Sequence, residues 1–204
     1  MAIGIKKGAV VATPPMGASF LWGMPQMPEF LEYPFYKSVV YDPYPLFFVG
    51  QINCAEAAPF DESGLLPKQG FLWFFADLDY FLGYTDETER QPGRWDKKAV
   101  QVLYSHVGRE ELAHEFLTFP SETEMMPPEA VLLEFCEVPD DADGAKLLGK
   151  AADKEAEQAF GEGWQPLLQI PGDENLEAGR FSFYIEREAL SARKFRRVEG
   201  YLSE

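Results

Sequence analysis

Two parts of the sequence carry the same series of short motifs, and this repetition restricts the folds that the chain can adopt. Each copy has a Leu-x-Gly tripeptide, then an apolar run containing Gln-Ile, then a glycine that opens an aromatic run. The copies comprise residues 21–23, 46–53 and 70–75, and residues 147–149, 167–170 and 179–184. Self-similarity of this kind is typical of repeated supersecondary units.

The repetition predicts an α+β fold with a duplicated β-rich unit, made of two related antiparallel hairpin repeats with a few short helices. We expect a single domain over residues 1–204, with an internal pseudo-repeat at 19–107 and 145–204. A chain of this length buries enough surface to form a core without disulfide bonds or a structural metal. Its content of 46% apolar and 15% aromatic residues excludes a disordered protein.

The charge balance limits the possible partners. Thirty-four acidic residues against 18 basic ones give a formal net charge of −16, which repels nucleic-acid phosphates and anionic lipids. The longest apolar runs are shorter than the ~20 residues that span a bilayer. We therefore predict neither a nucleic-acid partner nor a membrane association.

The two cysteines, Cys54 and Cys136, form no disulfide framework and no Cys-x-x-Cys pair. Near the start of the chain, the apolar stretch 8–12 is too short for the core of a signal peptide. These features predict two reduced thiols and a cytoplasmic protein.

Hydrophobic patterning predicts the elements of the chain. Seven prolines among aromatic residues make segment 13–45 an irregular but packed layer. Strands are predicted at 46–53 and 70–77, as antiparallel neighbours, at 98–107 with one wetter face, and at 164–170 and 179–186. Helices are predicted at 108–117, 145–160 and 188–195, whereas 129–138 fits a strand or a helix.

Taken in order, the motifs at 45–53, 66–75, 147–149, 168–170 and 178–185 resemble the YwqG-like family over most of the chain. The resemblance implies a bacterial, intracellular α+β protein from a family without an established activity. Some members look like accessory genes beside secreted-toxin systems, which implies partner binding. The sequence departs from the family at residues 175–177, at Ala145 and at residues 150–151, so a site shared at those positions is altered here.

Amide side chains stand at the ends of predicted apolar strands. One interpretation is structural, with the amides bonding loop backbone and joining the two repeats. The alternative is a polar cleft between the repeats, suited to a small-ligand-binding protein or a hydrolase-like enzyme. That cleft would be lined by Gln51, Asn53, Asp77, Gln169, Glu177 and Arg180.

Catalytic and metal motifs are missing from the sequence. The two histidines, His106 and His114, lie in no metal-binding pattern, and no nucleophile or nucleotide-binding signature occurs. The carboxylates near Asp77 and Asp173 fit no calcium loop. We predict no catalytic residue, metal or cofactor.

The aromatic residues of segment 13–45 are of the types that anchor protein interfaces. We therefore predict a non-catalytic protein-interaction module, accessory or immunity-like, with contacts from Trp22, Tyr33, Phe35 and Tyr36. Six of the 18 basic residues lie at or beyond Arg180. They form either a patch for an anionic partner or a solvated surface paired with nearby glutamates.

Overall fold

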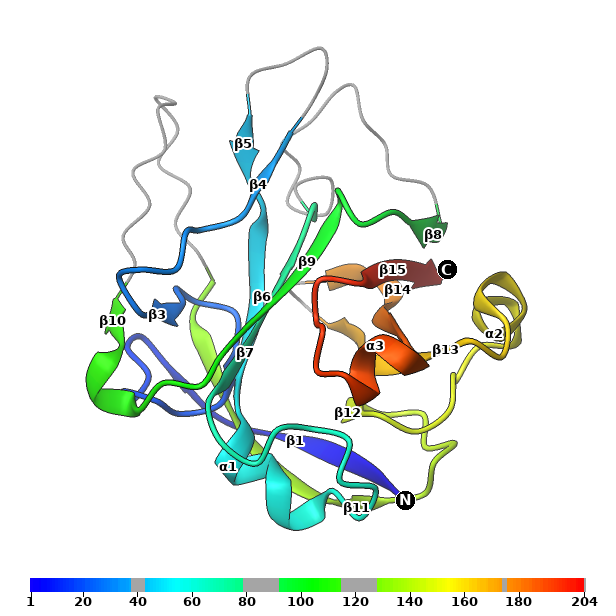
Figure 1. The fold of residues 1–204 in the computed structure, drawn as a ribbon, viewed down its shortest axis with the longest axis horizontal. Helices are drawn as coiled ribbons and strands as arrows, with labels where there is room; N and C mark the ends of the chain where they lie inside the picture. Colours follow the sequence, from blue (N-terminus) through cyan, green and yellow to red (C-terminus); the bar gives the residue numbers. More distant parts are fainter. Residues whose placement is uncertain (38–42, 79–91, 115–127, 174–175, 204) are drawn as a thin grey trace.

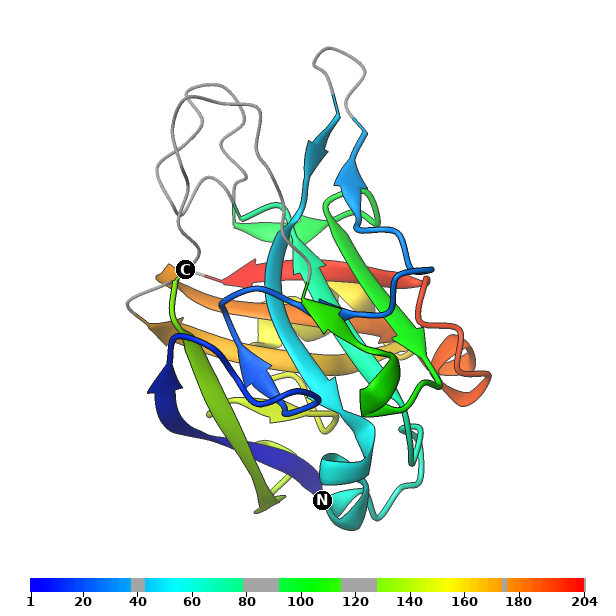
Figure 2. The same cartoon turned by 90° about the vertical axis from the view of Figure 1, so that its left-hand side faces the viewer.

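The computed structural model describes residues 1–37, 43–78, 92–114, 128–173 and 176–203, apart from the side chains of 173 and 176–178. Its main feature is an eleven-stranded antiparallel sheet that curls until it is nearly closed (Figures 1 and 2). The predicted α+β class with two hairpin repeats is therefore wrong. The strands join into one barrel-like sheet, and the helices between them are short.

The strand order in the sheet is β8-β15-β14-β13-β12-β1-β11-β2-β6-β7-β9. The bounds are β1 (Ala2–Val11), β2 (Phe20–Leu21), β6 (Phe47–Asn53), β7 (Phe71–Ala76), β8 (Gly93–Trp95), β9 (Val100–Ser105), β11 (Ala130–Val138), β12 (Lys146–Leu147), β13 (Trp164–Asp173), β14 (Leu176–Glu186) and β15 (Val198–Ser203).

The predicted strands at 46–53, 70–77 and 98–107 are confirmed as β6, β7 and β9, in adjacent antiparallel positions. All six residues of β7 are buried. Its even-numbered side chains join the cluster that reaches β14, where Phe74 and Phe183 lie 5.1 Å apart between ring centroids. Its odd-numbered ones, such as Trp73, face a second aromatic cluster. Both faces of the strand are covered, which explains why the run is continuously apolar.

Two long strands lie at the centre of the sheet order. Segment 129–138, which fitted a strand or a helix, is strand β11 and pairs with β1. The sequence analysis did not predict β1. Its first residues are buried, with Ile3 and Ile5 in the core, and its later part from Lys6 to Val10 is exposed. Strand β15 was also not predicted, and it pairs with β14 and β8.

The helices are shorter than predicted. Only Lys154–Phe160 forms a helix, α2, within the segment predicted at 145–160, because Lys146 and Leu147 form the strand β12. The helix predicted at 108–117 is a 3₁₀ turn at Arg109–Glu111 followed by β10 (Ala113–His114), and residues 115–117 lie outside the described chain.

Three further short helical segments complete the described helices. They are α1 (Cys54–Ala57), the 3₁₀ turn Ala58–Phe60, and α3 (Arg187–Ser191), which confirms part of the helix predicted at 188–195. Across the described residues, no helix has the length and apolar character needed to cross a membrane.

The described part of the proline-rich segment is a packed layer, as predicted. Strand β3 (Gln26–Met27) pairs with β10, and β4 (Phe35–Tyr36) pairs with β5 (Tyr44–Pro45). The layer shares the second aromatic cluster with β6 and β7. In Figure 2, the part of the layer that contains β4 and β5 extends beyond the upper end of the sheet.

Candidate functional site

A groove of about 520 Å³ lies between the proline-rich layer and β9. We name it the aromatic–basic groove. Its walls are formed by Phe30, Leu31, Glu32, Tyr33, Pro34, Phe35, Lys37, Lys97, Gln101, Val102, Leu103 and Arg196. Three distant stretches of the sequence therefore meet in one surface feature.

The wall from the proline-rich layer is held firmly to the sheet. The hydroxyl of Tyr33 donates to the carbonyl of Leu46 at 2.8 Å, and the Leu46 N–H donates to the carbonyl of Pro34 at 3.0 Å. The Tyr33 ring also lies edge-on to Phe75, with 5.0 Å between centroids. These contacts fix the backbone that presents Phe35 to the groove.

Two phenylalanines of this wall remain exposed despite the cost of hydrating a large ring. Phe30 is 68% exposed and Phe35 is 40% exposed. Most aromatic side chains of the described residues are buried or half-buried. Exposed apolar area that is gathered in a groove with a polar rim is typical of an interaction site.

The rim of the groove is positively charged, although the whole chain is strongly acidic. Lys37, Lys97 and Arg196 contribute three cations, and Glu32 is the one carboxylate in the described lining. Among the described residues, none of the three cations forms an ion pair with a carboxylate. Their charges are therefore available to an incoming anionic group.

The residues predicted to contact a partner fall in different places. Tyr33 and Phe35 line the groove, and Tyr36 lies beside it, stacked on Tyr44 with 5.2 Å between centroids. Trp22 is fully buried and packs against Phe47 in the core. The structure does not place Trp22 on a surface that a partner reaches.

The bonds of Gln51 reach loop backbone, as the structural interpretation proposed, but their described partners lie between residues 18 and 73 and do not join the two motif copies. The side chain is fully buried. Its Oε1 accepts from the indole N–H of Trp73 at 2.9 Å and from the Gln26 N–H at 3.1 Å, and its Nε2 donates to the Ala18 carbonyl at 3.0 Å. These bonds fasten the proline-rich layer onto β6 and β7, which satisfies polar groups that burial would otherwise leave unpaired.

Two other predicted cleft residues lie near Gln51 in the sequence but have their own partners. Asn53 caps α1, with its Oδ1 accepting from the Ala55 N–H at 3.0 Å. Asp77 is buried, and its two carboxylate oxygens accept from the Tyr44 hydroxyl at 3.1 and 3.0 Å. Glu177 lies in β14, and its side chain is outside the described residues.

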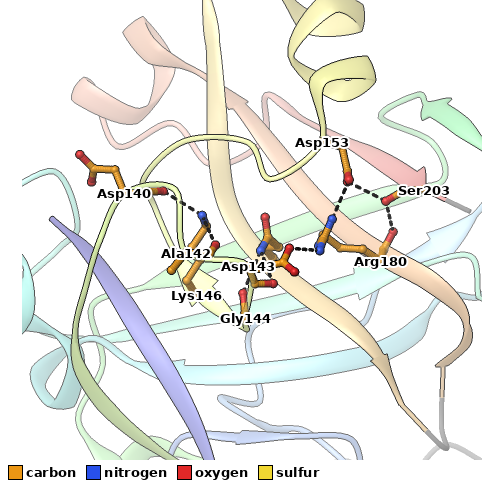
Figure 3. A network of polar contacts seen from close by, with 9 residues as sticks. Asp140, Ala142, Asp143, Gly144, Lys146, Asp153, Arg180 and Ser203 are labelled. Atoms are coloured by element: carbon orange, nitrogen blue, oxygen red, sulfur yellow. Dashed lines mark hydrogen bonds and ion pairs between the residues drawn. The ribbon is translucent and has the colours of Figure 1, made fainter.

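Arg180 belongs to a separate polar network at the loop before β12 (Figure 3), and Gln169 bonds the same loop. Gln169 Nε2 donates to the carbonyls of Gly144 at 2.8 Å and Asp143 at 3.3 Å. Arg180 pairs with the carboxylate of Asp143, and its other terminal nitrogen donates to Asp153 at 2.7 Å. Both residues therefore hold this loop against β13 and β14.

Lys146 is the member of this network that the sequence analysis missed. It is fully buried, and its Nζ donates to the carbonyls of Asp140 at 2.8 Å and Ala142 at 2.6 Å. Burial lowers the pKa of the Lys146 ammonium, and the neighbouring Arg180 lowers it further. The motif repetition indicated this burial. Lys146 stands directly before the second Leu-x-Gly tripeptide, and Phe20, which stands directly before the first, is buried.

The polar residues predicted for one cleft are thus divided between two sets of contacts. Gln51 bonds the proline-rich layer, and Gln169 and Arg180 bond the loop that contains Asp143. The basic residues near the end of the chain are also divided. Arg197 pairs with Glu186 at 2.8 Å, as the surface-pairing alternative predicted, whereas Arg196 lines the groove.

The fold and the groove define a mostly β protein with a nearly closed antiparallel sheet and an aromatic, positively charged surface groove. Residues 19–159 match a family described as a domain of unknown function, DUF1963, and the chain belongs to that family. No curated protein matches the sequence.

Proposed function

We propose that this protein is a protein-interaction module that binds an acidic segment of a partner protein in the aromatic–basic groove. The observation that carries the proposal is the exposure of Phe30 and Phe35 beside Lys37, Lys97 and Arg196, three cations without an ion pair among the described residues. The partner segment would offer an apolar side chain for the rings and carboxylates for the rim.

The two kinds of contact have different roles in such a complex. Covering an exposed phenylalanine contributes about 1.5–3 kcal/mol when burial is complete, so Phe30 and Phe35 would supply most of the affinity. Rim charges mainly raise the association rate and select the partner. The rigid attachment of Tyr33 to Leu46 supports the proposal, because a preorganised wall loses little freedom on binding.

A peptide fits the groove better than a nucleic acid does. The net charge of −16 repels a long phosphate backbone, whereas a short acidic peptide reaches only the local cations. The resemblance to YwqG-like proteins supports the same proposal, with an accessory or immunity-like role in the cytoplasm as its more specific form.

A peptide selection tests this function. A phage-displayed library is selected on the immobilised protein, and enriched peptides are measured by fluorescence anisotropy at low and high salt. We expect peptides that combine an aromatic or large aliphatic residue with several Asp or Glu residues, and weaker binding at high salt. Enrichment of neutral or basic peptides would contradict the proposal.

Matched variants assign the binding to the groove. Phe30→Ser and Lys97→Glu should each raise the peptide Kd about tenfold or more. The controls are Val10→Ser, which changes an exposed valine on β1, and Lys98→Glu, which reverses the charge of an exposed neighbour. If the groove variants bind as tightly as their controls, the peptide occupies another surface.

A further inference from the structure

A second pocket, of about 660 Å³, lies at the opposite end of β6 from the groove. We name it the Asn53 pocket. Its lining comes from residues 15–18, from 53, 55 and 56, from 69–71 and from 106–110. Its volume is in the range of small-molecule sites. Of the six residues predicted for the cleft between the repeats, Asn53 is the one in the described lining of this pocket.

The charged groups of the Asn53 pocket do not neutralise one another. Arg109 is exposed and makes one long hydrogen bond, from a terminal nitrogen to the Met16 carbonyl at 3.4 Å. Within the described chain, its guanidinium forms no ion pair with Glu56 or Glu110, although both line the same pocket. Positive and negative side chains therefore line one pocket without pairing with each other in the described part of the chain.

The frame of the pocket holds these groups in position. Glu56 is held from one side, because one of its carboxylate oxygens accepts from the Ser19 N–H at 3.1 Å while the other has no described partner. Asn53 is fixed by its bonds to the Ala55 N–H and, from Nδ2 at 2.8 Å, to the Gly17 carbonyl.

Apolar residues also belong to the lining of the pocket. They include Met16, Phe71 and Val107, and the Phe71 ring packs against Trp73, with 5.8 Å between centroids. A ligand in the pocket would therefore meet apolar residues as well as charged ones.

We infer that the Asn53 pocket binds a small zwitterion with an apolar side chain, either a free amino acid or a short peptide. The planar guanidinium of Arg109 suits the two oxygens of a carboxylate. The carboxylate oxygen of Glu56 that has no partner among the described residues suits an ammonium group, and Met16 and Phe71 suit the apolar side chain. This inference uses none of the residues of the aromatic–basic groove and is independent of the function proposed for it.

Titration calorimetry with matched probes tests the inference on the full chain. L-Leucine and the dipeptide L-leucyl-L-leucine carry both charges, N-acetyl-L-leucine lacks the ammonium, and L-leucinamide lacks the carboxylate. We expect one of the two zwitterions to bind, and each blocked analogue to bind at least about tenfold more weakly. The ammonium and carboxylate groups lie further apart in the dipeptide than in the free amino acid. Which of the two zwitterions binds therefore shows which spacing of charges the pocket accepts.

Variants connect the result to the pocket. Arg109→Gln should abolish the preference for the zwitterion over L-leucinamide, and Glu56→Gln should abolish its preference over N-acetyl-L-leucine. The control Arg197→Gln removes an exposed arginine of another surface and should bind as the unaltered chain does. Equal affinity for zwitterion and blocked analogues, or no binding of either zwitterion at millimolar concentration, overturns the inference.

Discussion

Trp22 and Leu148 adopt the same left-handed backbone conformation at the middle of the two Leu-x-Gly tripeptides. Their φ angles are 62° and 59°. Such a conformation costs about 1–2 kcal/mol for a residue with a side chain. Both side chains are buried, at 0% and 4% exposure, and that burial offsets the cost.

The two tripeptides also share their hydrogen bonding. The Trp22 N–H donates to the carbonyl of Val49 at 3.0 Å, and the Leu148 N–H donates to that of Leu167 at 3.2 Å. In each case the acceptor lies in the strand that contains the Gln-Ile of the same motif copy. The motif repetition therefore corresponds to a repeated local geometry. The boundaries 19–107 and 145–204 stay a prediction.

The glycine that follows Leu148 should tolerate no side chain. Gly149 has a φ of +84°, and an added Cβ would lie 2.7 Å from the Asp140 carbonyl oxygen and 2.8 Å from the Ala2 Cβ. We expect Gly149→Ala to lower the free energy of unfolding by about 1–3 kcal/mol, measured by urea denaturation. Gly144→Ala, where the new Cβ meets nothing within 4 Å, is the control and should change stability little.

Replacing Gln51 by leucine should destabilise the fold although the size of the side chain is kept. The variant leaves the Gln26 N–H and the Ala18 carbonyl without their present partners, and each unsatisfied buried group costs about 1–3 kcal/mol. Thermal unfolding should show a clear fall in Tm. Gln158→Leu, on the exposed face of α2, should leave Tm nearly unchanged, and an equal effect of both variants would contradict the assigned role.

Lys146 should make stability depend on alkaline pH. Burial and Arg180 lower the pKa of its ammonium, against the opposing effect of Asp141, Asp140 and Asp143. Between the lowered pKa and the ordinary value, the unfolded chain holds a proton that the folded chain has released. The free energy of unfolding contributed by Lys146 therefore rises with pH in that window.

The measurement is urea unfolding of the unaltered chain and of Lys146→Met from about pH 7 to about pH 10. The difference in unfolding free energy should grow in favour of the unaltered chain as pH rises. The raised pKa values of Tyr104 and Tyr184 lower the free energy of unfolding as pH rises. Both tyrosines are present in the unaltered chain and in the Lys146→Met variant, so the comparison of the two removes this effect. Lys150→Met, which replaces an exposed lysine nearby, is the matched control for the removal of a lysine.

The two cysteines should differ in reactivity. Burial raises the pKa of the Cys54 thiol to about 12, so almost none is thiolate near pH 8. Cys136 is only half-buried. Iodoacetamide should therefore alkylate one site rapidly in the native protein, and peptide mapping should identify it as Cys136. Rapid native labelling of Cys54 would show that its pocket opens readily.

Sequence reasoning predicted the strands whose pattern is decided locally. β6 and β7 are runs of bulky apolar residues between breakers, and Tyr33 and Phe35 stood out as interface types. β1 was missed because Lys6 and Lys7 interrupt its apolar residues, although pairing with β11 keeps that stretch extended. At 145–148, helix-forming composition was overridden by pairing with β1 and β13.

The candidate sites depend on contacts that sequence spacing does not carry. The aromatic–basic groove exists because Lys97 and Arg196, about one hundred residues apart, meet Phe35 of the proline-rich layer. The shared cleft of Gln51 and Gln169 was inferred from their matching motifs. Gln51, however, donates to the Ala18 carbonyl and Gln169 donates to the Gly144 carbonyl. A sequence motif does not specify which way such a side chain points.

The near closure of the sheet limits the backbone edges that this chain can offer to other copies of itself. The ends of the strand order are β8 and β9, and β15, the neighbour of β8, also lies against β9. An open sheet with strands as aromatic as β7 would offer two long edges to other copies during concentration or storage. Here one terminal strand is only three residues long, and the other faces its own sheet, so little backbone is presented for fibril-like pairing.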